Sequence, residues 1–150
     1  MTDVALDTSV IIECIDLKGR FHSQAEGVFV GALTGELTAL IPNVFLAEAY
    51  YVSYGIYKRL GLTDAAARTE KLIEWLYGSP NTEIVSGTLD LALESGRIKR
   101  DFGPALTDSY VIAAAKLHKG KALFKKRETE MYKQISSLVK EYPLVFLEDY

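Results

Sequence analysis

Short apolar segments alternate with longer amphipathic segments along this chain. The short segments have the length of buried strands, and we expect five of them, at residues 4–6, 38–41, 82–85, 121–124 and 144–146. Capping residues, glycines and prolines bound the longer segments, which are expected to be helices at residues 8–14, 22–34, 43–60, 63–77, 88–99, 107–119 and 128–140. Strands that alternate with helices pair in parallel, so the sequence predicts a three-layer α/β/α sandwich with a central, mostly parallel five-stranded sheet.

The composition predicts one domain in a reducing compartment. Residues 1–150 contain no linker, repeat or low-complexity tract, and this length suits a single domain. The only cysteine, Cys14, excludes an internal disulfide and a cysteine-rich zinc site. The apolar stretch 37–57 is long enough to raise the question of a membrane span, but Pro42 and Glu48 interrupt it, and acids interrupt the N-terminus before an apolar leader could form. We therefore expect a cytoplasmic protein without membrane contact.

Three acids lie in apolar surroundings that do not explain a charge. Glu48 is the only ionisable residue, tyrosines aside, between Leu37 and Tyr57. Asp7 follows the first expected strand, and Asp108 precedes an alanine-rich apolar helix. Desolvating a carboxylate is costly unless something positive compensates it, so these acids indicate a shared cation.

The expected fold brings these acids toward one place. Ligands of an open α/β sheet gather beyond the carboxyl ends of its strands, where Asp7 would lie and which Glu48 and Asp108 could reach from helix starts. Asp7 could instead be only a helix N-cap, and Asp108 only an acid favoured in a first helical turn. Glu48 has no comparable structural explanation, and the three together favour the cation site.

Three segments carry a family resemblance, in order and nearly from end to end of the chain. They are LDTSVII at 6–12, PNVFLAE at 42–48 and LTDSYVIAAA at 106–115. Together they resemble the motifs of the PIN-domain ribonucleases, particularly the VapC-type toxins of prokaryotic toxin–antitoxin pairs. The resemblance implies a PIN-like fold and an antitoxin protein as partner.

The resemblance also implies a reaction, hydrolysis of phosphodiester bonds in single-stranded RNA. Carboxylates suit Mg²⁺ or Mn²⁺, so Asp7 and Asp108 would hold the metal and Glu48 would ligate or orient it, as catalytic residues of an endoribonuclease. Thr8 or Ser9 would fix Asp7 or contact the substrate. An aspartyl-phosphate phosphohydrolase also opens with a strand and an aspartate, but it would need a second aspartate where Ser9 stands.

The chain departs from the family pattern where a fourth acid is usual. That place reads Lys125-Lys126-Arg127-Glu128, and Glu128 is the nearest substitute as a metal ligand, with Glu130 expected to face away from the site. The three basic residues, Lys125, Lys126 and Arg127, would bind the phosphate groups of the RNA backbone. Because they replace the acid, a catalytically weak or inactive PIN-fold module for RNA or protein binding remains the alternative.

The helices expected at 43–60 and 63–77 carry more apolar side chains than a small sheet can cover. Exposed apolar surface of that kind marks a partner surface, and two-fold dimers are the commonest solution. The sequence therefore predicts a homodimer.

Overall fold

The computed structural model of the protein describes residues 2–150, and its centre is a five-stranded sheet in which every pairing is parallel. The strands are β1 (Thr2–Leu6), β2 (Leu37–Pro42), β3 (Thr82–Val85), β4 (Lys121–Phe124) and β5 (Leu144–Phe146). Their order across the sheet is β3-β2-β1-β4-β5. The expected α/β sandwich is confirmed.

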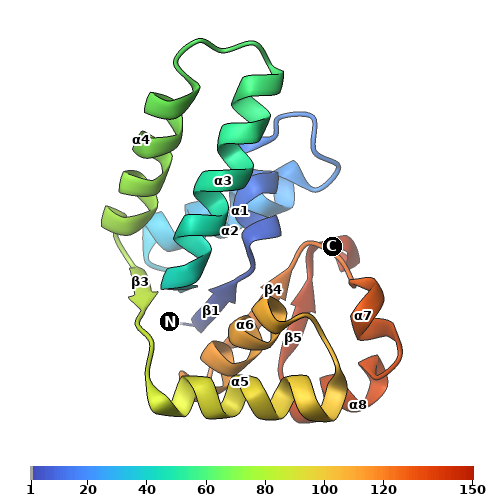
Figure 1. The fold of residues 1–150 in the computed structure, drawn as a ribbon. Coiled ribbons are helices and arrows are strands. Elements are labelled where there is room, and N and C mark those ends of the chain that lie inside the picture. The colour runs from blue at the N-terminus through green and yellow to red at the C-terminus, as the bar shows by residue number, and fades with distance from the viewer. Residues whose placement is uncertain (1) are drawn as a thin grey trace.

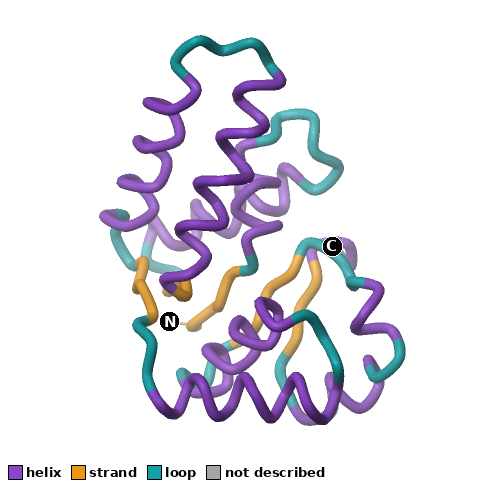
Figure 2. Tube along the Cα trace, in the orientation of Figure 1, coloured by secondary structure: helices purple, strands orange, loops and turns teal. Residues whose placement is uncertain are grey.

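Helices cover both faces of this sheet, as Figure 2 shows. They are α1 (Thr8–Ile15), α2 (His22–Thr34), α3 (Asn43–Arg59), α4 (Ala65–Gly78), α5 (Leu89–Phe102), α6 (Leu106–Leu117), α7 (Thr129–Tyr132) and α8 (Ile135–Glu141). Helix α6 packs on β1, β2 and β4, and α5 packs on α6. On the other face, α1 and α2 pack together, while α3 and α4 form a hairpin that projects beyond the sheet (Figure 1).

The strand order creates a switch point between β1 and β4. From β1 the chain moves outward through β2 to β3, and then returns to place β4 on the other side of β1. Val4 pairs with Lys121, and the backbone N–H of Asp7 donates to the Leu123 carbonyl at 3.0 Å. The residues after β1 and β4 therefore meet at one edge, where such sheets bind ligands.

The core is built from the apolar runs that predict the strands. Ala5, Leu6, Leu40 and Ile41 are fully buried in the sheet, as expected for parallel strands covered on both faces. On α6, residues 111–115 are buried without interruption, because their small and branched side chains let the helix lie close to the sheet. This close packing positions the start of α6 at the edge of the sheet.

The expected helix 128–140 is wrong in one respect, since two short helices occupy that segment. Gln134 leaves the helical conformation (φ −126°, ψ 14°), and its N–H donates a hydrogen bond to the carbonyl of Met131 in a tight turn. Met131 and Leu138, on either side of this break, are both fully buried, which indicates that tertiary packing rather than local preference sets the path of the backbone there. The strands at 82–85, 121–124 and 144–146 and the helix at 22–34 are confirmed with the same bounds.

Within residues 2–150, no helix combines the length and the apolar character that a membrane crossing demands.

Candidate metal and active site

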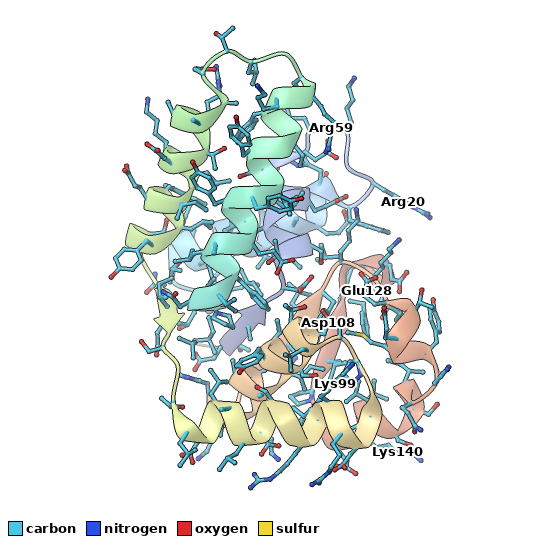
Figure 3. All side chains as sticks on the ribbon, in the orientation of Figure 1. Arg20, Arg59, Lys99, Asp108, Glu128 and Lys140 are labelled. Atoms are coloured by element: carbon cyan, nitrogen blue, oxygen red, sulfur yellow. The ribbon has the colours of Figure 1, made fainter. Side chains whose placement is uncertain are left out.

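A cleft of about 420 Å³ opens at the carboxyl edge of the sheet beside the β1–β4 switch point. Asp7, Glu48 and Asp108, from three separate segments, all line it. Two further acids, Glu128 and Glu130, line it from the segment after β4, and Figure 3 shows Glu128 on the same side of the sheet as Asp108. The cleft thus gathers five carboxyl groups, with Lys125 as the one basic side chain among its lining residues.

Asp7 is both the N-cap of α1 and a wall of the cleft. Its carboxylate accepts the Ser9 backbone N–H at 3.0 Å and a short hydrogen bond from the Ser9 hydroxyl. Asp7 therefore has the N-cap role that the sequence left open for it, in addition to its place in the cleft. Burial nevertheless raises the pKa of Asp7, and the hydrogen bonds from Ser9 and Thr8 only partly oppose that rise.

Asp108 is the most poorly compensated of these acids. It is the third residue of α6, only 6% exposed, and its Oδ2 atom has no hydrogen-bond partner within residues 2–150. Burial, and then the nearby charges of Asp7, Glu128, Glu130 and Glu48, raises the pKa of Asp108 to about 7. An unpaired buried carboxylate is expensive unless a cation or proton joins it.

Glu48 reaches the cleft from the second turn of α3, where it is half-buried. Burial and the charge of Asp7 raise the pKa of Glu48. The Thr8 hydroxyl lies close enough to oppose this rise, yet it is buried without a hydrogen bond of ordinary geometry. Two buried oxygen atoms in this cleft, Thr8 Oγ1 and Asp108 Oδ2, are thus left unsatisfied in the protein alone.

Glu130 does not face away from the cleft, which corrects the expectation from helical periodicity. Glu128 is the N-cap of α7 with extended backbone (φ −81°, ψ 155°), so the helical rotation per residue does not apply between it and Glu130. Both side chains line the cleft. The carboxylate of Glu128 makes no capping hydrogen bond, which leaves it available to the cleft.

The donor set fits a hard divalent cation in type and charge. All five acids offer carboxylate oxygens, which Mg²⁺ and Mn²⁺ prefer, and the repulsion among them would fall when a cation binds. Among residues 2–150, however, no three metal-binding side chains already stand as a ready metal site. The arrangement therefore needs side-chain adjustment to enclose an ion, which suits a metal that retains several waters.

Lys125 lines the cleft, but its ammonium group forms an ion pair with an acid outside the cleft. Its Nζ atom lies 2.8 Å from Oε2 of Glu13, a residue of α1 that is only 2% exposed. The other oxygen of Glu13 accepts the Phe21 backbone N–H at 2.7 Å. Sequence analysis missed Glu13, although the same signal that identifies Glu48, an acid inside an apolar run, is present at residues 10–15.

Arg127 is also engaged outside the cleft. Its guanidinium bonds to Glu148 and Asp149, each at 2.9 Å, and lies 4.2 Å from the centre of the Phe146 ring. Lys126 is exposed and has no ion pair within residues 2–150. Of the three basic residues expected to contact RNA, Lys126 alone therefore has a free charge.

Comparisons with known proteins agree with this architecture. The PIN domain family profile matches residues 4–133. A VapBC2 complex from Rickettsia felis, solved with a DNA fragment from its promoter, contains a chain 13% identical, with a TM-score of 0.65 and coverage of 96% of this chain and 98% of that one. A toxin–antitoxin complex from Klebsiella pneumoniae contains a chain 17% identical, with a TM-score of 0.62 and coverages of 96% and 97%.

A third similar structure is VapC20 of Mycobacterium tuberculosis, described as a toxin that cleaves the sarcin–ricin loop. It is 13% identical, with a TM-score of 0.59, and the alignment covers 87% of this chain and 93% of that one. At these identities the likeness is one of fold. No curated protein matches the sequence significantly.

Proposed function

The chain belongs to the PIN-domain family, and from that premise we propose that it is a metal-dependent endoribonuclease that hydrolyses phosphodiester bonds of single-stranded RNA. The main observation in support of this proposal concerns the carboxylate of Asp108. Its buried, unpaired carboxylate with a pKa near 7 stands in a cleft with four more acids, and a bound cation would relieve that charge. The type of reaction is inferred from membership of the PIN-domain family.

Asp7 and Asp108 would hold Mg²⁺ or Mn²⁺, with Glu48 ligating or orienting and Glu128 supplying the fourth acid. The ion would make water a stronger nucleophile and offset the charge that develops on the phosphate. Ser9 donates its hydroxyl hydrogen to Asp7 and so fixes the direction of that carboxylate. The buried Thr8 hydroxyl in the cleft has no hydrogen bond of ordinary geometry within residues 2–150. Both hydroxyls are placed to act on Asp7 or the substrate.

The substrate strand would contact the basic residues beside the cleft. Lys126 is the first candidate, because its ammonium group is exposed and forms no ion pair with any described residue. Lys125 and Arg127 would contribute if RNA displaces their present partners. Neutralising Lys126 should lower the salt dependence of RNA binding.

We place this activity in the toxin of a VapBC-type toxin–antitoxin pair, acting in the cytoplasm as one PIN-like domain over residues 1–150. The support is that similar folds occur in the VapBC2 and Klebsiella complexes. The antitoxin would cover the acidic cleft, and the toxin would form a homodimer.

The test is cleavage of a panel of labelled single-stranded RNAs by purified protein with Mg²⁺, with Mn²⁺ and with a chelator. Asp7→Asn and Asp108→Asn should each lower the rate by about a hundredfold or more, beyond the usual effect of losing an outer partner of a ligand. Asp101→Asn, which changes an exposed acid of α5 outside the cleft, is the matched control.

Circular dichroism would show that each variant keeps its fold. An Asp108→Asn protein as active as the wild type would place the activity elsewhere or in a contaminant. A wild-type protein that binds Mn²⁺ yet cleaves none of the RNAs would favour the interaction module, which the replacement of the fourth acid by Lys125-Lys126-Arg127 motivates.

A further inference from the structure

Lys125 stands within reach of two competing negative charges. Its backbone N–H donates to the Ser9 hydroxyl oxygen at 3.3 Å, and that hydroxyl donates to the Asp7 carboxylate. The base of the Lys125 side chain is therefore only two hydrogen bonds away from a proposed metal ligand. From this position its four-carbon side chain can extend toward Glu13 or into the acidic cleft.

The structure shows which charge holds the lysine. Lys125 Nζ lies 2.8 Å from Glu13, whereas the groups that act on the pKa of Asp108 beyond burial are all acids. The lysine side chain is one-third exposed and Glu13 is almost completely buried, so the pair anchors the lysine against the protein interior. Within residues 2–150, none of the five carboxyl groups of the cleft forms an ion pair that a bound cation would have to replace.

Glu13 is itself held in place from two sides. The Phe21 backbone N–H donates to its Oε1 atom, and Gly19 packs so closely that a Cβ there would lie 2.5 Å from the same oxygen. The loop between α1 and α2 thus fixes the carboxylate that fixes the lysine. Glu13 lies outside the cleft lining, so its role differs from that of the five acids.

We propose that Glu13 is a positioning residue that keeps the Lys125 ammonium out of the acidic cleft, and so keeps the cleft open to a divalent cation. Without Glu13, the lysine would turn toward Asp7 and its neighbours and become an internal competitor of the metal. The inference rests on the proposed metal site. It applies because this chain has a lysine, Lys125, directly after β4.

The experiment measures Mn²⁺ affinity by calorimetry, without RNA. Glu13→Gln should weaken Mn²⁺ binding by about tenfold or more, comparable to the loss of an outer partner of a metal ligand. Adding Lys125→Met to Glu13→Gln should restore the affinity, because the competitor is gone. A merely structural role of Glu13 predicts no such rescue.

The matched control is Glu94→Gln. Glu94 is another buried glutamate paired with a lysine, since its Oε1 lies 2.7 Å from Lys116 Nζ, but neither residue lines the cleft. This variant should bind Mn²⁺ as the wild type does. Should Glu13→Gln fail to fold, Gly19→Ala displaces the same carboxylate without changing any charge, and it should also weaken Mn²⁺ binding.

A second readout works without metal. In the presence of a chelator, Lys125→Met and Glu128→Gln should shift the melting temperature additively in the wild-type background, because the Lys125 ammonium pairs there with Glu13 and not with Glu128. In the Glu13→Gln background the same two changes should be non-additive, because the released lysine now pairs with cleft acids.

Unchanged Mn²⁺ affinity in both Glu13→Gln and Gly19→Ala, or a double variant no better than Glu13→Gln, would overturn the inference. Additive shifts in both backgrounds would overturn it as well. Failure of the proposed function is a different result, in which the wild-type protein itself binds no Mn²⁺.

Discussion

Asp7 and Asp108 share a cleft but differ in how the protein treats their charge. Asp7 caps α1 and accepts two hydrogen bonds from Ser9, whereas one buried oxygen of Asp108 has no partner within residues 2–150. The first carboxylate therefore contributes to the fold as well as to the proposed site. Burying the charged Asp108 carboxylate costs free energy, and only a bound ligand or a proton removes that cost.

This difference predicts how the metal-free protein responds to pH. The pKa of Asp108 is about 7 in the folded protein against an ordinary 3.8, so the folded state retains a proton that the unfolded chain has lost. Stability contributed by this residue therefore falls as pH rises from 3.8 to 7 and stays low above 7. In the presence of a chelator, Asp108→Asn should raise the free energy of unfolding at pH 8 by at most about 4 kcal/mol, and raise the melting temperature with it. At pH 4 the substitution should change both quantities little.

Thermal unfolding at the two pH values, with and without Mn²⁺, checks this expectation. Mn²⁺ should stabilise the wild type and not the Asp108→Asn protein. If Asp108→Asn destabilised the metal-free protein at pH 8, the carboxylate would have favourable partners that the structure lacks.

The acids after β4 should contribute unequally to metal binding. Glu128 and Glu130 both raise the pKa of Asp108, with the larger effect from Glu128, and Glu128 is the less exposed of the two. Glu128→Gln should therefore weaken Mn²⁺ binding more than Glu130→Gln, as calorimetry can measure. Equal and negligible effects would mean that Asp7, Glu48 and Asp108 suffice.

At this scale, sequence reasoning located Asp7, Glu48 and Asp108 because each acid stands beside a long apolar run. It placed Glu130 wrongly, because a helical count was applied to a residue pair that begins outside the helix. The partners of Lys125 and Arg127 could not be foreseen, since Glu13 and the Glu148–Asp149 segment are distant in sequence and only the β4–β5 and α1 packing brings them near.

At the scale of elements, the approach of β4 to β1 depends on Gly120. This buried residue precedes β4 and lies so close to the Asp3 backbone that a Cβ would overlap the Asp3 carbonyl oxygen. Gly120→Ala should destabilise the protein by about 1–3 kcal/mol, as overpacking does, and weaken Mn²⁺ binding because β1 and β4 bound the cleft.

The comparison for this variant is Gly96→Ala, whose added Cβ meets no atom within 4 Å on the exposed side of α5. It should stabilise the protein by about 0.5–1 kcal/mol, since alanine is the better helix former. Denaturant unfolding measures both changes. A Gly120→Ala protein as stable as the wild type would show that the two strands can separate slightly without loss.

The elements themselves were largely predictable, because apolar runs bounded by glycine, proline and capping residues define them locally. The strand order was not, since it depends on pairings such as Val4 with Lys121 that join distant parts of the chain. The break between α7 and α8 escaped prediction for a similar reason, because tertiary burial of Met131 and Leu138 outweighs local preference there.

At the scale of the molecule, the α3–α4 hairpin offers the surface for the proposed dimer. It projects from the sheet in Figure 1 and exposes large apolar side chains, among them Tyr51 at 78% and Tyr77 at 65%. Light scattering at micromolar concentration should give twice the chain mass of 16.6 kDa. Tyr51→Lys with Tyr77→Lys should yield monomers, because burying two ammonium groups opposes association.

Tyr132→Lys is the control, since Tyr132 is 60% exposed on α7, away from the hairpin. Its mass should equal that of the wild type. A monomeric wild type would contradict the prediction outright, and a dimer that survives both hairpin substitutions would place the interface on another face.

The position of β4 in the sheet also has a consequence for the protein during its own translation. Asp7 and Glu48 emerge from the ribosome early, but the strand that completes the cleft beside β1 begins only at Lys121. At about 5–20 residues per second, several seconds separate the synthesis of the first acids from that of their last neighbours. A ribosome that makes this chain therefore carries the acidic residues without the cleft, and any activity that resides there begins only when the C-terminal third has been made.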